Sequence, residues 1–234
     1  MISGSIYFFV DLKEAFDSIV RDFLWFLLAK KCGVPINVVA SIRKLHDGIN
    51  AKTLYRSELG GFFDMNTGVR QGSIEGPSLW NFFYTFLLID WGKRCKERLG
   101  DKRGVTFEYT LDGSLRTGAF TSIINDLEYA DDLVVFETDK NRFSEVTRIL
   151  DETCTDWGAE ISITKTKWMY VSPDPNGNRE LPEVYIRAEK IERVHEFLYL
   201  GSIVGDSYSL GIFEETKYKK ILIDLIDSSL SRIK

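Results

Sequence analysis

The sequence predicts an α+β fold in which helices and antiparallel strands are interspersed. Short apolar runs rich in β-branched and aromatic residues, such as residues 6–10, are typical of buried strands. Longer segments in which apolar residues recur at helical spacing, such as residues 77–98, are typical of helices. The 234 residues, of which 44% are hydrophobic and 28% charged, suffice for one large domain or two small ones with a buried core.

Four segments carry helical periodicity, and residues that favour helix ends bound them. Gly33 would close the first helix and Pro35 would start the second, while Asp139 would cap the fourth before it ends at Gly158. The inner face of the second helix would comprise Val38, Val39, Ile42 and Leu45. We therefore expect helices at residues 16–31, 35–47, 77–98 and 139–157, and an amphipathic segment at residues 210–234.

Strand-like runs lie between these helices and are separated by turn residues. One hairpin is expected around Gly60 and Gly61, and another near Asp112 and Gly113. Two further strands would bracket a turn at Ala130, Asp131 and Asp132. The expected strands cover residues 6–10, 51–58, 61–65, 105–120 (a hairpin), 126–137 (two strands), 167–171, 184–187 and 197–200.

The bulk features favour an intracellular protein without a membrane partner. The longest apolar run, near residues 23–29, falls far short of the roughly 20 residues of a membrane span. The N-terminus lacks the basic segment of a signal peptide. Cys32, Cys95 and Cys154 are odd in number and scattered, which predicts neither a disulfide framework nor a zinc site. Nucleus and cytoplasm are both compatible with these features.

Three carboxylates occupy positions where charge is costly. Asp11 ends an apolar run, and Asp131 and Asp132 lie between two apolar runs. Clustered like charges repel one another unless a cation holds them, and a tight turn lets neighbouring carboxylates approach one ion pair. Carboxylate oxygens are the ligands that Mg²⁺ prefers. Each segment alone favours a solvated hairpin turn or a helix cap, so the argument depends on finding both together with the glycine motif of residues 68–72.

Five segments, in chain order, resemble motifs A to E of the reverse transcriptases, from about residue 6 to residue 204. Motif A resembles Phe8-Phe9-Val10-Asp11 through Phe16-Asp17, and motif C resembles Tyr129-Ala130-Asp131-Asp132 followed by residues 133–136. Motif B resembles Gly68-Val69-Arg70-Gln71-Gly72-Ser73 with Pro77. Motifs D and E resemble Lys165-Thr166-Lys167-Trp168-Met169 and Phe197-Leu198-Tyr199-Leu200-Gly201. The forms of motifs B and E look most like those of non-LTR (LINE-type) retrotransposons.

This resemblance implies a polymerase palm, an antiparallel sheet with RRM-like packing of helices on one face. Partial fingers would be formed by about residues 33–75, and the palm core would extend over residues 1–205. Residues 206–234 would be the helical start of a thumb or connection.

The resemblance also implies a catalytic site. Asp11 and Asp131 would be the principal metal ligands, with Asp132 completing the acidic cluster. Two Mg²⁺ ions, for which Mn²⁺ is a possible substitute, would be the cofactors. Lys165 would lie near the triphosphate and could donate a proton to the pyrophosphate leaving group. A solvated lysine at a strand start is an equally good interpretation of Lys165.

A nucleotide pocket and a primer grip follow from the same resemblance. Phe16 would be a steric gate, because a flat ring under the sugar excludes a 2′-hydroxyl by bulk. Phe16 is equally well explained as a core aromatic residue. Without the resemblance, residues 68–72 would be interpreted as an ordinary loop and the motif E run as core. The nucleotide-binding residues would be Leu12, Phe16, Arg70, Gln71 and Gly72. The primer grip would comprise Phe197, Tyr199, Leu200 and Gly201.

Other polar residues are given structural interpretations. His46 and His195 lie in polar stretches, and neither has a partner at a metal-ligand spacing. Asp17 is interpreted as a helix N-terminal charge that interacts with the helix dipole.

The function implied is RNA-directed DNA synthesis, in which deoxynucleotides are added to a primer 3′-hydroxyl. Its partners would be an RNA template, a DNA primer and deoxynucleoside triphosphates. The net charge of −5 argues against nucleic acid, but two Mg²⁺ ions would bring it to −1. We expect weak or no activity for this segment alone. The alternatives are a catalytically incompetent retroelement-derived fragment that acts as an RNA-binding or interaction module, and an RNA-templated RNA polymerase, which the bulky Phe16 disfavours.

Overall fold

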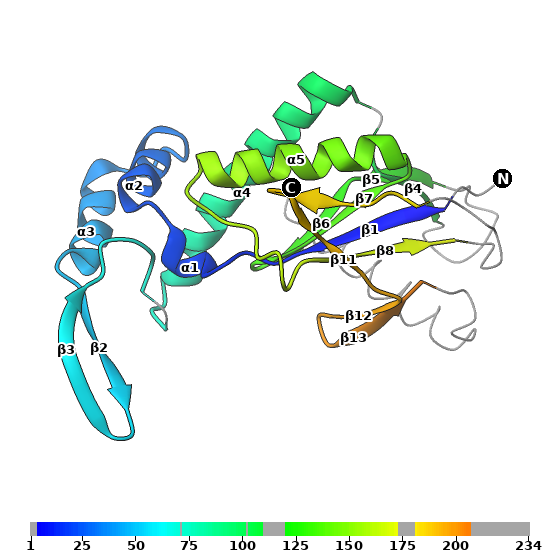
Figure 1. Ribbon diagram of the computed structural model, residues 1–234. Helices are drawn as coiled ribbons and strands as arrows, with labels where there is room; N and C mark the ends of the chain where they lie inside the picture. The colour runs from blue at the N-terminus through cyan, green and yellow to red at the C-terminus, as the bar shows by residue number, and fades with distance from the viewer. Residues whose placement is uncertain (1–3, 71, 102, 110–119, 173–180, 207–234) are drawn as a thin grey trace.

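The computed structural model describes residues 4–70, 72–101, 103–109, 120–172 and 181–206. Its centre is a five-stranded sheet with strand order β11-β8-β1-β7-β6 (Figure 1). These strands are β1 (Ser5–Val10), β6 (Asp126–Tyr129), β7 (Asp132–Glu137), β8 (Lys167–Val171) and β11 (Glu192–Arg193). The short apolar segment expected at residues 6–10 is therefore the central strand of the molecule.

The sheet is antiparallel except at one edge. β1 pairs antiparallel with both β7 and β8, and β6 pairs antiparallel with β7. β11, however, pairs parallel with β8, with Glu192 opposite Lys167. The expectation of a wholly antiparallel sheet is wrong at this edge. A parallel neighbour requires the chain to return to the starting end of the strand, and the turn-rich segment before β11 gave no sign of that return.

Five helices accompany the sheet in the described part of the chain: α1 (Ala15–Ser18), α2 (Arg21–Lys30), α3 (Ile36–His46), α4 (Gly76–Leu99) and α5 (Lys140–Asp156). The single helix expected over residues 16–31 is interrupted at Ile19 and Val20, whose ψ angles of 123° and 102° are extended. The carbonyl of Ile19 accepts a hydrogen bond from the Gly68 N–H at 2.8 Å. A tertiary contact has replaced a helical one there.

The buried face of α3 differs from the expected one. Val39 is buried as expected, but Val38 and Leu45 are 42% and 59% exposed. His46, expected in polar surroundings, is fully buried and packs edge-on against the Trp25 ring. Residues 39, 42 and 46 lie on one helical stripe, so the true inner face is one residue to the side of the predicted one.

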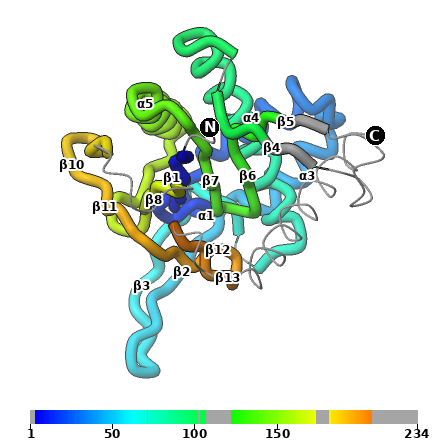
Figure 2. The backbone as a smooth tube through the Cα atoms, turned by 90° about the vertical axis from the view of Figure 1, so that its right-hand side faces the viewer, coloured from blue at the N-terminus to red at the C-terminus, as the bar shows by residue number. Residues whose placement is uncertain are grey.

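A hairpin of β2 (Asn50–Tyr55) and β3 (Glu58–Asp64) extends away from the body in two views (Figures 1 and 2). Its turn lies at Arg56 and Ser57, both with positive φ, and not at the expected Gly60 and Gly61. The two glycines instead lie opposite Thr53, where the register shifts. Two residues with positive φ form the turn that suits the twist of paired strands, and here two non-glycine residues adopt it.

Three smaller hairpins complete the described structure: β4 (Val105–Tyr109) with β5 (Phe120–Ile124), β9 (Tyr185–Ile186) with β10 (Glu189–Lys190), and β12 (Glu196–Tyr199) with β13 (Ser202–Gly205). The turn expected near Asp112 and Gly113 and the segment at residues 210–234 lie outside the described residues. The start of α5 is confirmed, because the Asp139 carboxylate accepts hydrogen bonds from the N–H groups of Asn141 and Arg142.

The two faces of the sheet contribute to separate cores. Ile6, Phe8 and Val10 of β1 join the main core, which includes buried residues of α2, α4 and α5. Phe9 points to the other side and forms a second cluster with Val134, Phe136 and Met169. This alternation is that of a strand with both faces covered. Phe197, Tyr199 and Val204 pack against the second cluster, so the β12–β13 hairpin covers the face opposite the main core.

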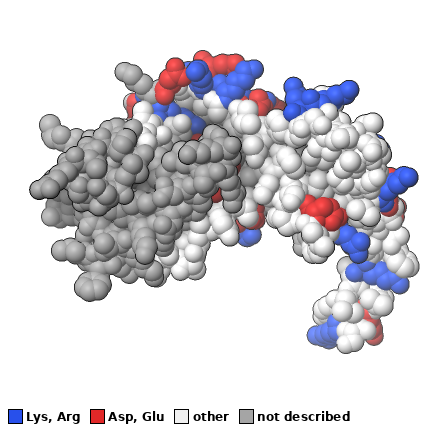
Figure 3. Space-filling view, turned by 180° about the vertical axis from the view of Figure 1, so that it is seen from behind, with Lys and Arg blue, Asp and Glu red and all other residues white. Residues whose placement is uncertain are grey.

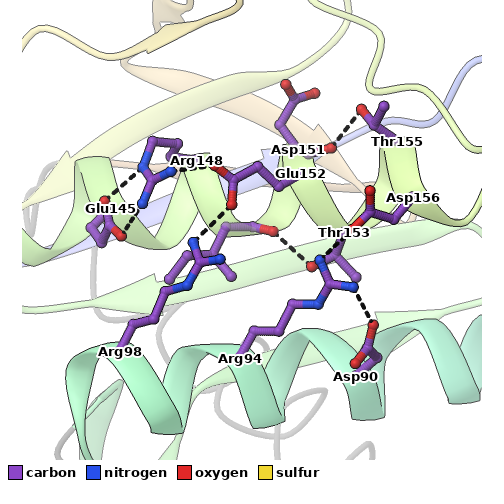
Figure 4. A network of polar contacts seen from close by, with 11 residues as sticks. Asp90, Arg94, Arg98, Glu145, Arg148, Asp151, Glu152, Thr153, Thr155 and Asp156 are labelled. Carbon is purple, nitrogen blue, oxygen red and sulfur yellow. Dashed lines mark hydrogen bonds and ion pairs between the residues drawn. The ribbon is translucent and has the colours of Figure 1, made fainter.

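Ion pairs connect the outer sides of α4 and α5 (Figure 4). Arg94 contacts Asp90 at 2.9 Å and Asp156 at 2.6 Å, and Arg98 contacts Glu152 at 2.7 Å. On the face seen in Figure 3, Lys and Arg side chains are scattered among acidic and uncharged ones. None of the helices in the described ranges combines the length and apolar character required to cross a bilayer.

Candidate active site

Pairing between β1 and β7 brings the distant acidic segments together. The last pair in the register joins Val10 to Leu133, so Asp11 follows β1 at the level where Asp132 begins β7. In the neighbouring pair of strands, Tyr129 lies opposite Asp132, which leaves Ala130 and Asp131 as a two-residue turn. The sheet register therefore places Asp11 beside the Asp131–Asp132 turn, as the sequence pattern predicted.

The turn is supported by the main core. Ala130 has a positive φ of 55°, which is unusual for a residue with a Cβ atom. The indole N–H of Trp80, a fully buried residue of α4, donates a hydrogen bond to the Ala130 carbonyl at 3.0 Å. The buried Trp80 side chain thus holds the turn that carries Asp131 against the main core.

Asp11 and Asp131 act electrostatically on Asp132. The pKa of Asp132 is raised above its ordinary value by burial, and then by the negative charges of Asp131 and Asp11. One oxygen of Asp11, Oδ1, is buried and accepts no hydrogen bond from the described residues. It lies 3.4 Å from Nζ of Lys165, the residue that the resemblance would place near the triphosphate. A buried carboxylate oxygen that accepts no hydrogen bond from the described residues, whose ion-pair partner is an exposed lysine and which lies beside two further carboxylates, fits a divalent cation.

The expected convergence of the three carboxylate groups on shared metal ions is not found in the described residues. Within the described ranges, no group of three or more His, Cys, Asp or Glu side chains is arranged so that it could hold a metal ion. The donor chemistry of Asp11, Asp131 and Asp132 fits Mg²⁺, whose usual ligands are carboxylates supplemented by water and phosphate. Sharing an ion would require the carboxylate oxygens to move closer together.

The segment before β8 holds Asp11 through its main chain. The N–H of Ser162 donates to the Asp11 carbonyl at 2.8 Å, and the Asp11 N–H donates to Oγ1 of Thr166 at 3.2 Å. Thr166 is fully buried. Sequence reasoning missed the supporting role of both residues, since only the fold shows that residues 160–166 run beside residues 11–13.

The steric-gate candidate and the glycine loop are in direct contact. The Phe16 ring stacks on Trp80 with centroids 5.2 Å apart. The Val69 N–H donates to the Phe16 carbonyl at 2.9 Å. A Cβ atom on Gly68 would lie 2.6 Å from Cα of Asp17, so only glycine fits there. The loop is thus seated on the helix that carries Phe16.

The other candidate residues for the nucleotide pocket differ in how exposed they are. Arg70 is exposed, and Gly72 has a φ of +80° that suits glycine. The Leu12 side chain is buried in the main core, so it does not line an open pocket. Gln71 lies outside the described residues.

The primer-grip candidates form the β12–β13 hairpin against the sheet. Phe197 stacks on Phe9 with centroids 4.3 Å apart, and Leu200 and Gly201 form the turn with positive φ angles. The pKa of the Tyr199 phenol is raised by burial and by the negative charge of Asp132. Tyr199 and Leu200 also line a pocket of about 320 Å³ with Tyr129, next to the acidic turn. The hairpin therefore lies beside the candidate metal site.

Sequence reasoning also missed Arg21 and the buried role of His46. Arg21 donates hydrogen bonds to the main-chain carbonyls of His46, Met65, Thr67 and Gly68. The Nδ1 atom of His46 lies 3.1 Å from the Ile42 carbonyl, and its Nε2 atom lies 3.5 Å from the Arg70 N–H group that can donate to it. No local pattern marks either residue, because their partners come from separate segments.

Comparison with known proteins identifies the family and the fold. The family model described as "Reverse transcriptase (RNA-dependent DNA polymerase)" matches residues 2–204. No curated protein matches the sequence. The solved telomerase of Candida tropicalis, in complex with a fragment of telomeric RNA, is similar with a TM-score of 0.52 and 12% identity over 90% of this chain. The corresponding Candida albicans telomerase gives a TM-score of 0.52 and 13% identity over 90% of this chain.

These structural neighbours share the fold, and this chain covers 31% and 32% of their lengths. The family model covers most of the chain, including all five motif segments. The chain therefore belongs to the reverse transcriptase (RNA-dependent DNA polymerase) family.

Proposed function

We propose that this chain is the palm segment of an RNA-directed DNA polymerase from a non-LTR retrotransposon, with partial fingers at about residues 33–75. It would add deoxynucleotides to a primer 3′-hydroxyl as directed by an RNA template. The observation that carries the proposal is the β1–β7 register, which brings Asp11 beside the Asp131–Asp132 turn. The RNA held by the similar telomerase structures supports a nucleic-acid partner.

Asp11, Asp131 and Asp132 would hold two Mg²⁺ ions, or Mn²⁺ in their place. When bound, such ions activate the attacking hydroxyl and neutralise charge on the phosphates. Lys165, already 3.4 Å from Asp11, would contact the triphosphate and protonate the pyrophosphate as it leaves. Thr166 and Ser162 would keep the Asp11 main chain fixed while these charges change.

The neighbouring elements would position the two substrates. Phe16, held against Trp80, would lie under the sugar and exclude a 2′-hydroxyl. The main chain around Leu12 and the loop with Arg70, Gln71 and Gly72 would contact the nucleotide. The β12–β13 hairpin, with Phe197, Tyr199, Leu200 and Gly201, would steady the primer end.

Activity of this segment by itself would be weak. Phosphoryl transfer depends mainly on positioning and charge neutralisation. The similar telomerase chains are about three times as long as this one, and the additional parts of such chains can supply positioning.

Single-turnover primer extension on an RNA template with a DNA primer, at excess protein and with Mg²⁺ or Mn²⁺, tests the proposal. We expect slow addition of the complementary deoxynucleotide by the parent chain and none by Asp131→Asn. Addition that is absent with both ions, or equal in the variant, would contradict the catalytic role.

A second candidate is a catalytically incompetent RNA-binding or interaction module. It is favoured by one observation, namely that no three acidic side chains in the described ranges are arranged as a metal-binding group. Such a module would bind RNA equally well with and without divalent ions, and Asp131→Asn would leave its binding unchanged.

A further inference from the structure

The guanidinium of Arg21 is surrounded by main-chain carbonyl oxygens. Its Nε donates to Gly68 at 2.7 Å, and its Nη2 donates to Thr67 at 2.9 Å. Its Nη1 donates to Met65 at 2.7 Å and to His46 at 2.9 Å. One side chain at the start of α2 therefore binds the end of α3, the residue after β3 and the start of the glycine loop.

Only arginine has the geometry for this set of contacts. Its planar group presents five N–H donors in a fixed fork, whereas lysine presents three donors from a single nitrogen atom. The four oxygens approach three different nitrogens of Arg21. A lysine at this position would keep the charge but lose most of the hydrogen bonds.

The contact with Gly68 links Arg21 to the candidate nucleotide pocket. Both main-chain polar groups of Gly68 are held, the carbonyl by Arg21 and the N–H by the Ile19 carbonyl at 2.8 Å. The next N–H, that of Val69, donates to the Phe16 carbonyl. The loop is thus fastened on one side to the helix that carries Phe16 and on the other to Arg21.

The hydrogen bonds between Arg21 and the loop lie next to a pocket. Asp17, Arg21, Asn50, Met65 and Arg70 are among the residues that line a pocket of about 610 Å³ next to the loop. Side-chain packing therefore supports the loop on the side of buried Val69, while hydrogen bonds hold it on the pocket side.

We propose that Arg21 is a positioning residue that sets the separation between Phe16 and the start of the glycine loop, residues 68–70, and thereby the affinity and sugar selectivity for the incoming nucleotide. The effect on nucleotide affinity and sugar selectivity rests on the proposed polymerase function, whereas the hydrogen bonding of the loop to Arg21 does not. Arg21 acts through Gly68 and Val69 and makes no contact with the acidic cluster that would carry out the chemistry.

Two measurements on Arg21→Lys and Arg21→Met test the proposal. In hydrogen exchange, we expect the amides of Gly68 and Val69 to exchange at least about tenfold faster in both variants, while those of β1 and β7 keep the parent rate. In primer extension, we expect KM for the deoxynucleotide to rise about tenfold and kcat to change by less than about threefold. Discrimination against ribonucleotides would fall in parallel.

Arg43→Met is the matched control. Arg43 lies nearby, is half-exposed, and pairs with Asp22 at 3.4 Å and Asp47 at 3.8 Å. Exchange and KM should stay at the parent values in this variant. Unchanged exchange at Gly68 and Val69 in Arg21→Lys, or a loss confined to kcat, would overturn the positioning role. If the parent chain adds no nucleotide but the Arg21 variants still show faster exchange at Gly68 and Val69, the role of Arg21 in holding the loop is upheld and the polymerase function is refuted.

Discussion

Nζ of Lys165 lies 3.4 Å from Oδ1 of Asp11, a carboxylate oxygen that accepts no hydrogen bond from the described residues. Lys165 is 69% exposed on its side chain, so it can move away from Asp11 at little cost. The lysine is thus the counter-ion of a carboxylate that we propose as a metal ligand. Lysine and metal would compete for the same oxygen, and this competition has a measurable consequence.

Replacing Lys165 should separate metal binding from catalysis. Lys165→Gln removes the competing cation, so we expect tighter Mn²⁺ binding in a titration followed by electron paramagnetic resonance. The same variant loses the proposed proton donor, so single-turnover nucleotide addition should slow by about 10²-fold. Lys140→Gln, a substitution remote from the site at the start of α5, is the control. A variant that binds Mn²⁺ more weakly than the parent would refute the competition.

Phe16 should control the choice of sugar. Phe16→Val removes the ring that stacks on Trp80, and we expect incorporation of ribonucleotides relative to deoxynucleotides to rise by about tenfold or more. Competition between the two nucleotides in primer extension measures this ratio. Phe26→Val, at a ring that is 49% exposed on α2, should leave the ratio unchanged. If the ratio in Phe16→Val equals that of the parent chain, Phe16 is a core residue and not a steric gate.

Gly68→Ala should destabilise the fold through a clash as well as through backbone strain. Gly68 and Gly48 both have positive φ, +77° and +67°, but only Gly68 has main-chain atoms within 3 Å of the added Cβ. We expect Gly68→Ala to cost about 2–4 kcal/mol and Gly48→Ala about 1 kcal/mol in free energy of unfolding, measured by urea denaturation. Equal costs would show that the loop can move away from α1.

Glu137 should make stability depend on pH. This residue ends β7, is 1% exposed, and its pKa is raised by burial despite hydrogen bonds from the N–H groups of Thr138 and Asp139. With a folded pKa above the unfolded one, the folded state binds more protons between the two values. Its contribution to stability is therefore present below the unfolded pKa and is lost as the pH rises through the folded pKa.

Thermal unfolding between pH 4 and pH 7, a range that begins near the ordinary Glu pKa of about 4.3 and extends above it, measures this effect. In the parent chain, the midpoint temperature of unfolding should fall as the pH rises through the upper part of this range. We expect a smaller fall in Glu137→Gln. Glu58→Gln, on the exposed β2–β3 hairpin, should keep the parent slope. A Glu137→Gln profile parallel to that of the parent would assign the pH dependence to other groups.

The proximity of the two acidic segments could be predicted from the sequence because it depends on strand ends. Asp11 after an apolar run and Asp131-Asp132 between two such runs could be placed together, because paired antiparallel strands bring an end and a turn to the same edge. Strong local signals were also reliable. The helix of residues 77–98 is found as α4, and Asp139 caps α5 as expected.

The features that sequence reasoning missed depend on contacts between distant segments. The helix break at Ile19 follows from its hydrogen bond with Gly68, and the burial of His46 follows from its packing on Trp25. The turn at Arg56 and Ser57 prevailed over the adjacent glycine pair, which the register shift opposite Thr53 accommodates. Arg21 binds carbonyl oxygens, which every residue carries, so no side-chain pattern could reveal its partners.

Mn²⁺ titration of the full chain, followed by electron paramagnetic resonance, tests the proposed metal site most directly. The parent chain should bind Mn²⁺, and both Asp11→Asn and Asp131→Asn should weaken that binding by about tenfold or more, because each removes a charged oxygen ligand. Asp64→Asn, on the exposed hairpin, should bind as the parent does. Identical titrations for the parent chain and the Asp11 and Asp131 variants would contradict a shared divalent site at these carboxylates.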